Sequence, residues 1–133
     1  MLTREELIQE AFKAMRFAHA PYSGYPVGAA VLTKDGRVFW GCNIENASYP
    51  AGNCGERTAL FNAVAHGVTK EDIAALAIVS NGKTIAAPCG ICRQVILELM
   101  DQDSPIYLSN GKETMETTLR ELLPFSFTRE DLA

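Results

Sequence analysis

Three features are missing from the 133-residue sequence, and each absence excludes a class of protein. No apolar run approaches the roughly 20 residues that a membrane-spanning helix needs. The polar N-terminal residues Thr3 to Glu6 are unlike a secretory signal peptide. No basic run occurs among 12 basic and 16 acidic residues, whereas nucleic-acid binding depends on Lys and Arg that neutralise phosphates. We therefore expect a cytoplasmic protein with a small-molecule ligand and no membrane or nucleic-acid partner.

The sequence also has no internal repeat, no low-complexity tract and no linker. Hydrophobic residues make up 47% of it, and a chain of this length buries roughly two-thirds of its unfolded surface, which is enough for a folded core. We therefore expect residues 1–133 to form a single domain. Cysteine occurs four times, and in a reducing compartment such thiols are more typical of metal ligands than of disulfides.

Apolar residues at helical spacing predict three main helices. Thr3 and Glu6 form a capping-box signature before the first helix, and Gly67 follows the second as a C-terminal cap. Pro88 is expected near the first turn of the third helix, where a missing N–H group is tolerated. The expected helices cover residues 3–19, 54–66 and 88–100, and a short helix with an aromatic tail follows over residues 119–132.

Apolar runs between these helices predict the strands. They cover residues 27–33, 37–41, 73–80, 105–109 and, more weakly, 112–117. Asp35-Gly36 is a hairpin signal between the first two. The link Asn110-Gly111 is too short for a helical crossover, so the last two strands should be antiparallel. The predicted fold class is α/β: a three-layer α/β/α sandwich with a mixed five-stranded sheet.

Residues that can hold a metal ion lie at the predicted starts of two helices. Cys89 and Cys92 are three apart and share a helix face, so both sulfurs can reach the ion that Cys54 also reaches. Three protein ligands leave the fourth position of a tetrahedral Zn²⁺ open to water, which is typical of catalytic zinc. Glu56 is the candidate to take the proton of that water. Arg57 is placed to offset the net negative charge of three thiolates and one Zn²⁺.

Two other uses of these cysteines remain open from the residues alone. Cys42 could complete a closed Cys₄ zinc site in a non-enzymatic module. Cys89 and Cys92 could form a redox pair, which would leave Cys54 and Glu56 without a role. The position of Glu56 favours the open, catalytic zinc site over both.

The motifs, taken in order, resemble the cytidine deaminases of the small, homotetrameric type with three cysteine ligands. In zinc deaminases a Glu carries protons without binding the metal, and a Pro-Cys-x-x-Cys run supplies two ligands. The runs that carry the resemblance are APYSGYPVGAA (20–30), GCNIENASYP (41–50), CGERTA (54–59), PCGICRQV (88–95) and LLP (122–124). The resemblance itself covers nearly the whole chain.

The resemblance implies hydrolytic deamination of cytidine and deoxycytidine to uridine and deoxyuridine plus ammonia, as a step in pyrimidine salvage. It implies one Zn²⁺ per subunit, held by Cys54, Cys89 and Cys92. Water activated by the zinc attacks C4 of the cytosine, while Glu56 takes its proton, delivers one to N3 and assists the loss of ammonia. It also implies a homotetramer in which neighbouring subunits complete each active site.

The same resemblance assigns substrate contacts. Asn43 and Glu45 match residues that bind the ribose hydroxyls, and Tyr25 matches an aromatic, commonly Phe, that packs against the pyrimidine. The residues expected at the subunit contact are Ala47 and Tyr49, which also line the site, and Phe127, which reaches a neighbouring site. Two alternatives remain: a deaminase of a modified cytosine nucleoside such as blasticidin S, for which Tyr25 is the feature to watch, and a nucleic-acid editing deaminase, which the acidic charge balance opposes.

Overall fold

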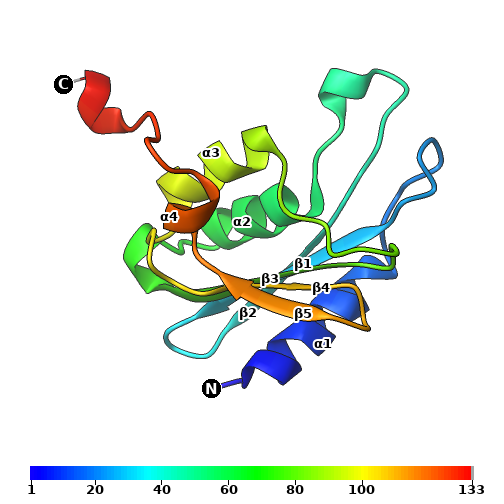
Figure 1. Cartoon of the computed structure of the whole chain (residues 1–133), viewed down its shortest axis with the longest axis horizontal. Helices are drawn as coiled ribbons and strands as arrows, with labels where there is room; N and C mark the ends of the chain where they lie inside the picture. Colours follow the sequence, from blue (N-terminus) through cyan, green and yellow to red (C-terminus); the bar gives the residue numbers. More distant parts are fainter. Residues whose placement is uncertain (133) are drawn as a thin grey trace.

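The structure, a computed structural model that describes residues 1–132, contains one five-stranded sheet in the order β2-β1-β3-β4-β5 (Figure 1). The strands are β1 (Val27–Thr33), β2 (Val38–Cys42), β3 (Ile73–Ser80), β4 (Ile106–Ser109) and β5 (Thr114–Thr117). The helices are α1 (Arg4–Met15), α2 (Gly55–Ala65), α3 (Gly90–Leu99) and the short α4 (Leu119–Leu122). Short 3₁₀ turns cover Tyr49–Ala51, Lys70–Asp72 and Arg129–Leu132. No helix within residues 1–132 combines the length and apolar character that crossing a bilayer requires.

The sheet is mixed, as the sequence predicts. Strand β1 pairs antiparallel with both β2 and β3, β3 pairs parallel with β4, and β4 pairs antiparallel with β5. The Asp35-Gly36 and Asn110-Gly111 turns both join antiparallel neighbours, and each glycine has a positive φ, 91° at Gly36 and 89° at Gly111. Glycine adopts this conformation at no steric penalty, so both hairpin predictions are confirmed.

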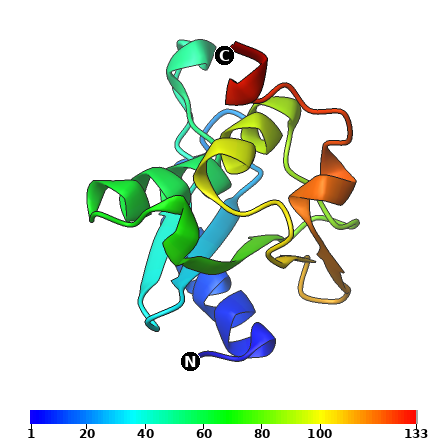
Figure 2. The same ribbon diagram turned by 90° about the vertical axis from the view of Figure 1, so that its left-hand side faces the viewer.

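Helices cover both faces of the sheet, which confirms the three-layer prediction (Figures 1 and 2). On one face, α2 and α3 pack on side chains that alternate along β1 and β3, such as Val31 and Ile78. On the other face, α1 packs on the intervening side chains, such as Ala30 and Ala77. Alternate residues of a strand point to opposite faces, so each strand contributes to both cores.

Two glycines let a helix approach the sheet at backbone distance. A Cβ atom on Gly41 in β2 would lie 2.1 Å from the backbone nitrogen of Ala59 in α2. A Cβ atom on Gly28 in β1 would lie 2.1 Å from the carbonyl oxygen of Ala11 in α1. Only a residue without a side chain fits at either position, so these glycines fix how closely α2 and α1 seat on opposite faces.

Strand direction places the starts of α2 and α3 together. Both β2 and β3 run antiparallel to β1, so they run parallel to each other and end at the same edge of the sheet. Helix α2 follows β2 and α3 follows β3 along the chain. The first turns of both helices therefore lie above that edge, and the four residues that the sequence singles out, Cys54, Glu56, Cys89 and Cys92, are carried there.

Helix α1 ends at Met15, four residues before the predicted end. The Thr3–Glu6 capping box at its start is present as expected. At its end, the backbone nitrogen of His19 donates to the carbonyl of Asn43 at 2.9 Å, and His19 pairs with Ile44 in an isolated bridge. The helical spacing continues past Met15, but the chain leaves the helix to bind this distant segment.

The other boundaries differ by one to two residues. Strand β2 covers Val38–Cys42 rather than residues 37–41. Helix α3 begins at Gly90 with Cys89 as its N-cap, so Pro88 precedes the helix instead of lying in its first turn. Gly67, with φ of 86°, follows the His66 C-cap of α2 as predicted.

Candidate metal centre and adjoining pocket

Three thiols converge where α2 and α3 begin. Cys54 is the N-cap residue of α2, Cys89 is the N-cap residue of α3, and Cys92 lies in the first turn of α3. The Sγ atoms of Cys54 and Cys89 are 4.0 Å apart, and those of Cys89 and Cys92 are 3.3 Å apart. All three sulfurs lie within 4.8 Å of one another. The N-terminal ends of two helices also favour negative charge at this point.

The cluster fits a zinc ion. Zinc–sulfur bonds of about 2.3 Å in a tetrahedral site place neighbouring sulfurs roughly 3.8 Å apart. The Sγ–Sγ separations of 3.3 Å (Cys89–Cys92) and 4.0 Å (Cys54–Cys89) lie on either side of that value. Cys42 is not part of the group, and its thiol stays apart at the end of β2 with a pKa that burial raises. Three ligands without a fourth cysteine match an open zinc site rather than a closed Cys₄ site.

Two charged residues of α2 flank the cluster. The Arg57 guanidinium donates to Cys54 Sγ through Nη2 at 3.5 Å, which places positive charge beside the thiolates. Glu56 is only 4% exposed, and burial raises the pKa of its carboxyl above the ordinary value, with the Cys54 thiolate acting in the same direction. A carboxyl in these surroundings can hold a proton and release it again, as a group that carries protons during the reaction must do.

The thiols do not ionise alike. A hydrogen bond from Cys92 lowers the pKa of the Cys54 thiol against the opposing effect of burial, and Arg57 lowers it further. The same interaction with Cys54, together with burial, raises the pKa of Cys92. The first negative charge of the cluster is therefore favoured on Cys54, beside the guanidinium.

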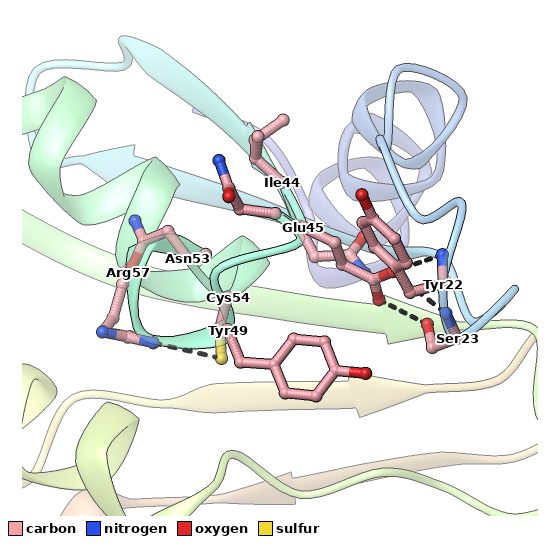
Figure 3. Close-up of a pocket in the computed structure, with 11 residues that line it drawn as sticks. Tyr22, Ser23, Ile44, Glu45, Tyr49, Asn53, Cys54 and Arg57 are labelled. Atoms are coloured by element: carbon pink, nitrogen blue, oxygen red, sulfur yellow. Dashed lines mark hydrogen bonds between the residues drawn. The ribbon is translucent and has the colours of Figure 1, made fainter.

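A cavity of about 400 Å³ adjoins the cluster and is large enough for a small ligand. Cys54 and Arg57 lie at one end of it, and Tyr22, Ser23 and Glu45 lie at the other (Figure 3). Its remaining lining residues come from the segment between β2 and α2: Asn43, Ile44, Asn46, Tyr49, Gly52 and Asn53. The predicted residues Asn43, Glu45 and Tyr49 are thus brought to the same cavity as Cys54.

The side chains of Asn43 and Glu45 are both anchored by backbone groups. Asn43 Oδ1 accepts from the Val27 nitrogen at 2.8 Å, and its Nδ2 donates to the Tyr25 carbonyl at 2.9 Å. Glu45 Oε1 accepts from the backbone nitrogens of Tyr22 and Ser23, both at 3.0 Å. These bonds hold the segment between α1 and β1 against the loop that follows β2.

Glu56, Cys89 and Cys92 are not among the residues that line this cavity, although Cys54 is. Tyr25, Ala47 and Phe127 do not line it either. The Tyr25 hydroxyl leans toward Gly82, 3.1 Å from where a Cβ atom there would lie. Ala47 is exposed on the loop before the Tyr49–Ala51 turn. The Phe127 carbonyl accepts from Gln94 Nε2 at 2.9 Å, and its side chain is largely exposed on the C-terminal tail. Their substrate contacts stay predictions.

Sequence reasoning missed Tyr22 and Ser23. They bind Glu45, which lies more than 20 residues further along the chain, and a single tyrosine and serine in a loop carry no periodicity that would mark them. The one available signal is their place inside the APYSGYPVGAA run, which is one of those that carry the family resemblance.

A family model described as "Cytidine and deoxycytidylate deaminase zinc-binding region" matches residues 1–108 of the chain. Two curated relatives named "Cytidine deaminase" are each 49% identical to it. The protein from Sporosarcina psychrophila aligns over 97% of this chain and 94% of its own length. The protein from Halalkalibacterium halodurans aligns over 98% of both chains.

Solved structures show the same similarity. A cytidine deaminase from Burkholderia pseudomallei superposes with a TM-score of 0.91 at 46% identity, over 95% of this chain and all of its own. A cytidine deaminase from Mycobacterium tuberculosis superposes with a TM-score of 0.82 at 35% identity, over 96% of this chain and 99% of its own. The similarity therefore covers the sheet, both helix starts and the cavity beside them.

Proposed function

The chain belongs to the cytidine and deoxycytidylate deaminase family, and from that premise we propose that it hydrolyses cytidine and deoxycytidine to uridine and deoxyuridine plus ammonia. The observation that carries the proposal is the junction of two features: a three-thiol cluster that fits zinc and a cavity that runs from it to an anchored carboxylate. A nucleoside has a base that must reach the reacting centre and a sugar whose hydroxyls need acceptors. The cavity has Cys54 of the thiol cluster at one end for the base and the Glu45 carboxylate at the other for the sugar.

Each residue at the metal end has a separate task in this proposal. Cys54, Cys89 and Cys92 hold the zinc, and Arg57 stabilises the thiolates through its contact with Cys54. Bound zinc supplies the Lewis acidity that makes water a nucleophile near neutral pH. Glu56 moves both protons of the water: it accepts the first and gives it to N3 of the cytosine, then accepts the second from the oxygen added to C4 and gives it to the leaving nitrogen. A C4–O bond forms and the C4–N4 bond breaks, so ammonia leaves and uridine remains.

At the sugar end, Asn43 and Glu45 bind the ribose hydroxyls. Support comes from their place on the wall of the cavity that also contains Cys54. Glu45 is ionised and can only accept hydrogen bonds, because the Ser23 hydroxyl and the neighbouring backbone N–H groups lower its pKa. Tyr25 is proposed to pack against the pyrimidine, and Tyr49, from the loop side, to close the cavity.

We propose that residues 1–133 act as one catalytic unit and assemble as a homotetramer. Phe125 is fully exposed and Phe127 largely so, on a tail that Figure 1 places well away from the loop carrying Ala47 and Tyr49. An exposed aromatic tail that does not reach its own cavity is suited to the site of a neighbouring copy. The four free cysteines agree with a reducing, cytoplasmic location and a role in pyrimidine salvage.

The test is the decay of the cytidine absorbance band with the zinc-loaded protein, run beside Glu56→Gln. The native chain should convert cytidine to uridine. The turnover rate of the variant should be lower by at least the factor of roughly 10²–10⁴ that a general acid/base contributes. Zinc content measured on both proteins is the control, and it should be equal. A Glu56→Gln variant that keeps near-normal turnover would refute the role of Glu56.

A modified cytosine nucleoside such as blasticidin S is not the favoured substrate. The relatives at 49% identity over nearly the whole chain carry the name cytidine deaminase. The same absorbance assay distinguishes the two substrates, because a chain that deaminated blasticidin S but not cytidine would show that the modified nucleoside is the substrate.

A further inference from the structure

The Glu45 carboxylate is held at the cavity wall by three donors from one short segment. The backbone nitrogens of Tyr22 and Ser23 each donate to Oε1 at 3.0 Å, and the Ser23 hydroxyl donates to Oε2 (Figure 3). Only the last of these bonds comes from a side chain. It is therefore the one bond that a substitution can remove while the backbone donors stay in place.

The count of acceptor sites limits what Glu45 can still bind. An ionised carboxylate offers about four lone-pair sites, two on each oxygen. The two backbone nitrogens occupy both sites on Oε1, and the Ser23 hydroxyl occupies one on Oε2. One site on Oε2 remains, and because Glu45 lines the cavity, that site is available to a single hydroxyl donor of a ligand.

The Ser23 hydroxyl is itself oriented. Its oxygen accepts a hydrogen bond from the backbone nitrogen of Tyr25 at 3.0 Å. A hydroxyl carries one hydrogen, and with a lone pair engaged by Tyr25 that hydrogen is directed to Glu45. Rotation of the carboxylate would break the Ser23 bond, so the free site on Oε2 keeps a fixed direction. Hydrogen bonds to charged groups are stronger than neutral ones, which makes this restraint significant even at an exposed wall.

We propose that Ser23 is a positioning residue for sugar recognition: its hydroxyl orients the Glu45 carboxylate so that the remaining Oε2 site accepts one ribose hydroxyl of the substrate. The inference rests on the proposed ribose-binding role of Glu45 and extends it to a residue that the sequence did not single out. Because Ser23 lies at the opposite end of the cavity from Cys54, its loss should weaken substrate binding and leave the chemical step largely unchanged.

The test compares kcat/KM for cytidine with kcat/KM for 2′,3′-dideoxycytidine, which has the same base and the 5′-hydroxyl but lacks the 2′- and 3′-hydroxyls of the ribose. The ratio of the two values cancels any effect that Ser23 exerts on the base through Tyr25. Ser23→Ala should lower the ratio about tenfold, mainly through a higher KM for cytidine, as expected for one bond to a charged group. In a Glu45→Gln background the same substitution should change the ratio by less than about twofold, because the two residues act as one unit.

Ser23→Thr keeps the hydroxyl and is the matched control, expected to keep the ratio of the native chain. Circular dichroism and melting temperatures verify that each variant is folded, and Ser23 lies in an exposed loop. If Ser23→Ala leaves the ratio unchanged while Glu45→Gln lowers it, the proposal for Ser23 is overturned and the role of Glu45 stands. An equal loss from Ser23→Ala in both backgrounds also overturns it. A native chain that does not prefer cytidine overturns both roles together.

Discussion

The two ends of the cavity are held in place by different means. At the metal end, α2 and α3 rest on a packed core: Ala59, Leu60 and Ala63 of α2 are fully buried, and Cys92 of α3 is buried too. At the sugar end, Tyr22 and Ser23 are exposed loop residues that donate hydrogen bonds to Glu45 and are not part of a buried core. The residues proposed to hold the metal and move protons thus sit on rigid elements. The residues proposed for recognition sit on loops, where we expect substitutions to change specificity without disturbing the metal centre.

The largest expected effect comes from breaking the packed end at Gly41. In Gly41→Ala the new Cβ atom would lie 2.1 Å from the Ala59 nitrogen, so α2 must move away from β2. Overpacking against backbone should lower the free energy of unfolding by about 3 kcal/mol or more, and Cys54 should move with the helix. Urea denaturation and zinc content per chain measure the two effects.

Gly90→Ala is the matched control, since nothing lies within 4 Å of its added Cβ atom. Equal stability of the two variants would contradict this account of α2.

A smaller effect is expected at the hydrogen-bonded end, as a pH dependence. The Ser23 hydroxyl and backbone N–H groups lower the pKa of Glu45 from its ordinary value of 4.5. A lowered carboxyl pKa stabilises the folded state above the unfolded pKa, and this stabilisation disappears as the pH falls through the folded pKa. The difference in melting temperature between the native chain and Glu45→Gln should therefore be constant above pH 4.5 and shrink below it. A difference that grows on acidification would contradict the sign of this shift.

The smallest effect is expected at Cys42, which belongs to neither end of the cavity. Its thiol is outside the three-sulfur group, and it does not line the cavity. Cys42→Ser should keep both the zinc stoichiometry and the turnover of the native chain, which metal analysis and the absorbance assay can check. Loss of zinc in this variant would return the closed Cys₄ site to consideration.

The features that depend on neighbouring residues are the ones that the sequence predicts well. The capping box at Thr3, the glycines of both hairpins and the Cys-x-x-Cys spacing are local signals, and each appears in the structure as expected. The strand order could not be predicted in this way, because it depends on which strands meet after folding. The end of α1 also depends on a distant contact: the apolar spacing continues, but the helix ends at Met15 and the chain then binds Asn43.

The hydrogen-bonded end is harder to predict for the same reason. Asn43 and Glu45 were found by resemblance, but the groups that hold them, on Val27, Tyr25 and Ser23, lie 16 to 22 residues away. A bond between a side chain and a distant backbone group leaves no periodic pattern in the sequence. The contacts proposed for Tyr25, Ala47 and Phe127 involve a substrate or a second copy, and a single chain cannot display them.

The shared direction of β2 and β3, which brings α2 and α3 to one edge, also governs when the centre can assemble during folding. Cys54 and Cys89 are 35 residues apart, and closing a loop of that length opposes their meeting until other contacts form. In an unfolded chain only Cys89 and Cys92 are near enough to share an ion, so the third sulfur arrives with the sheet. Contacts between distant segments of this kind form late. We therefore expect the metal to bind after the sheet has brought the three sulfurs together, rather than to nucleate folding.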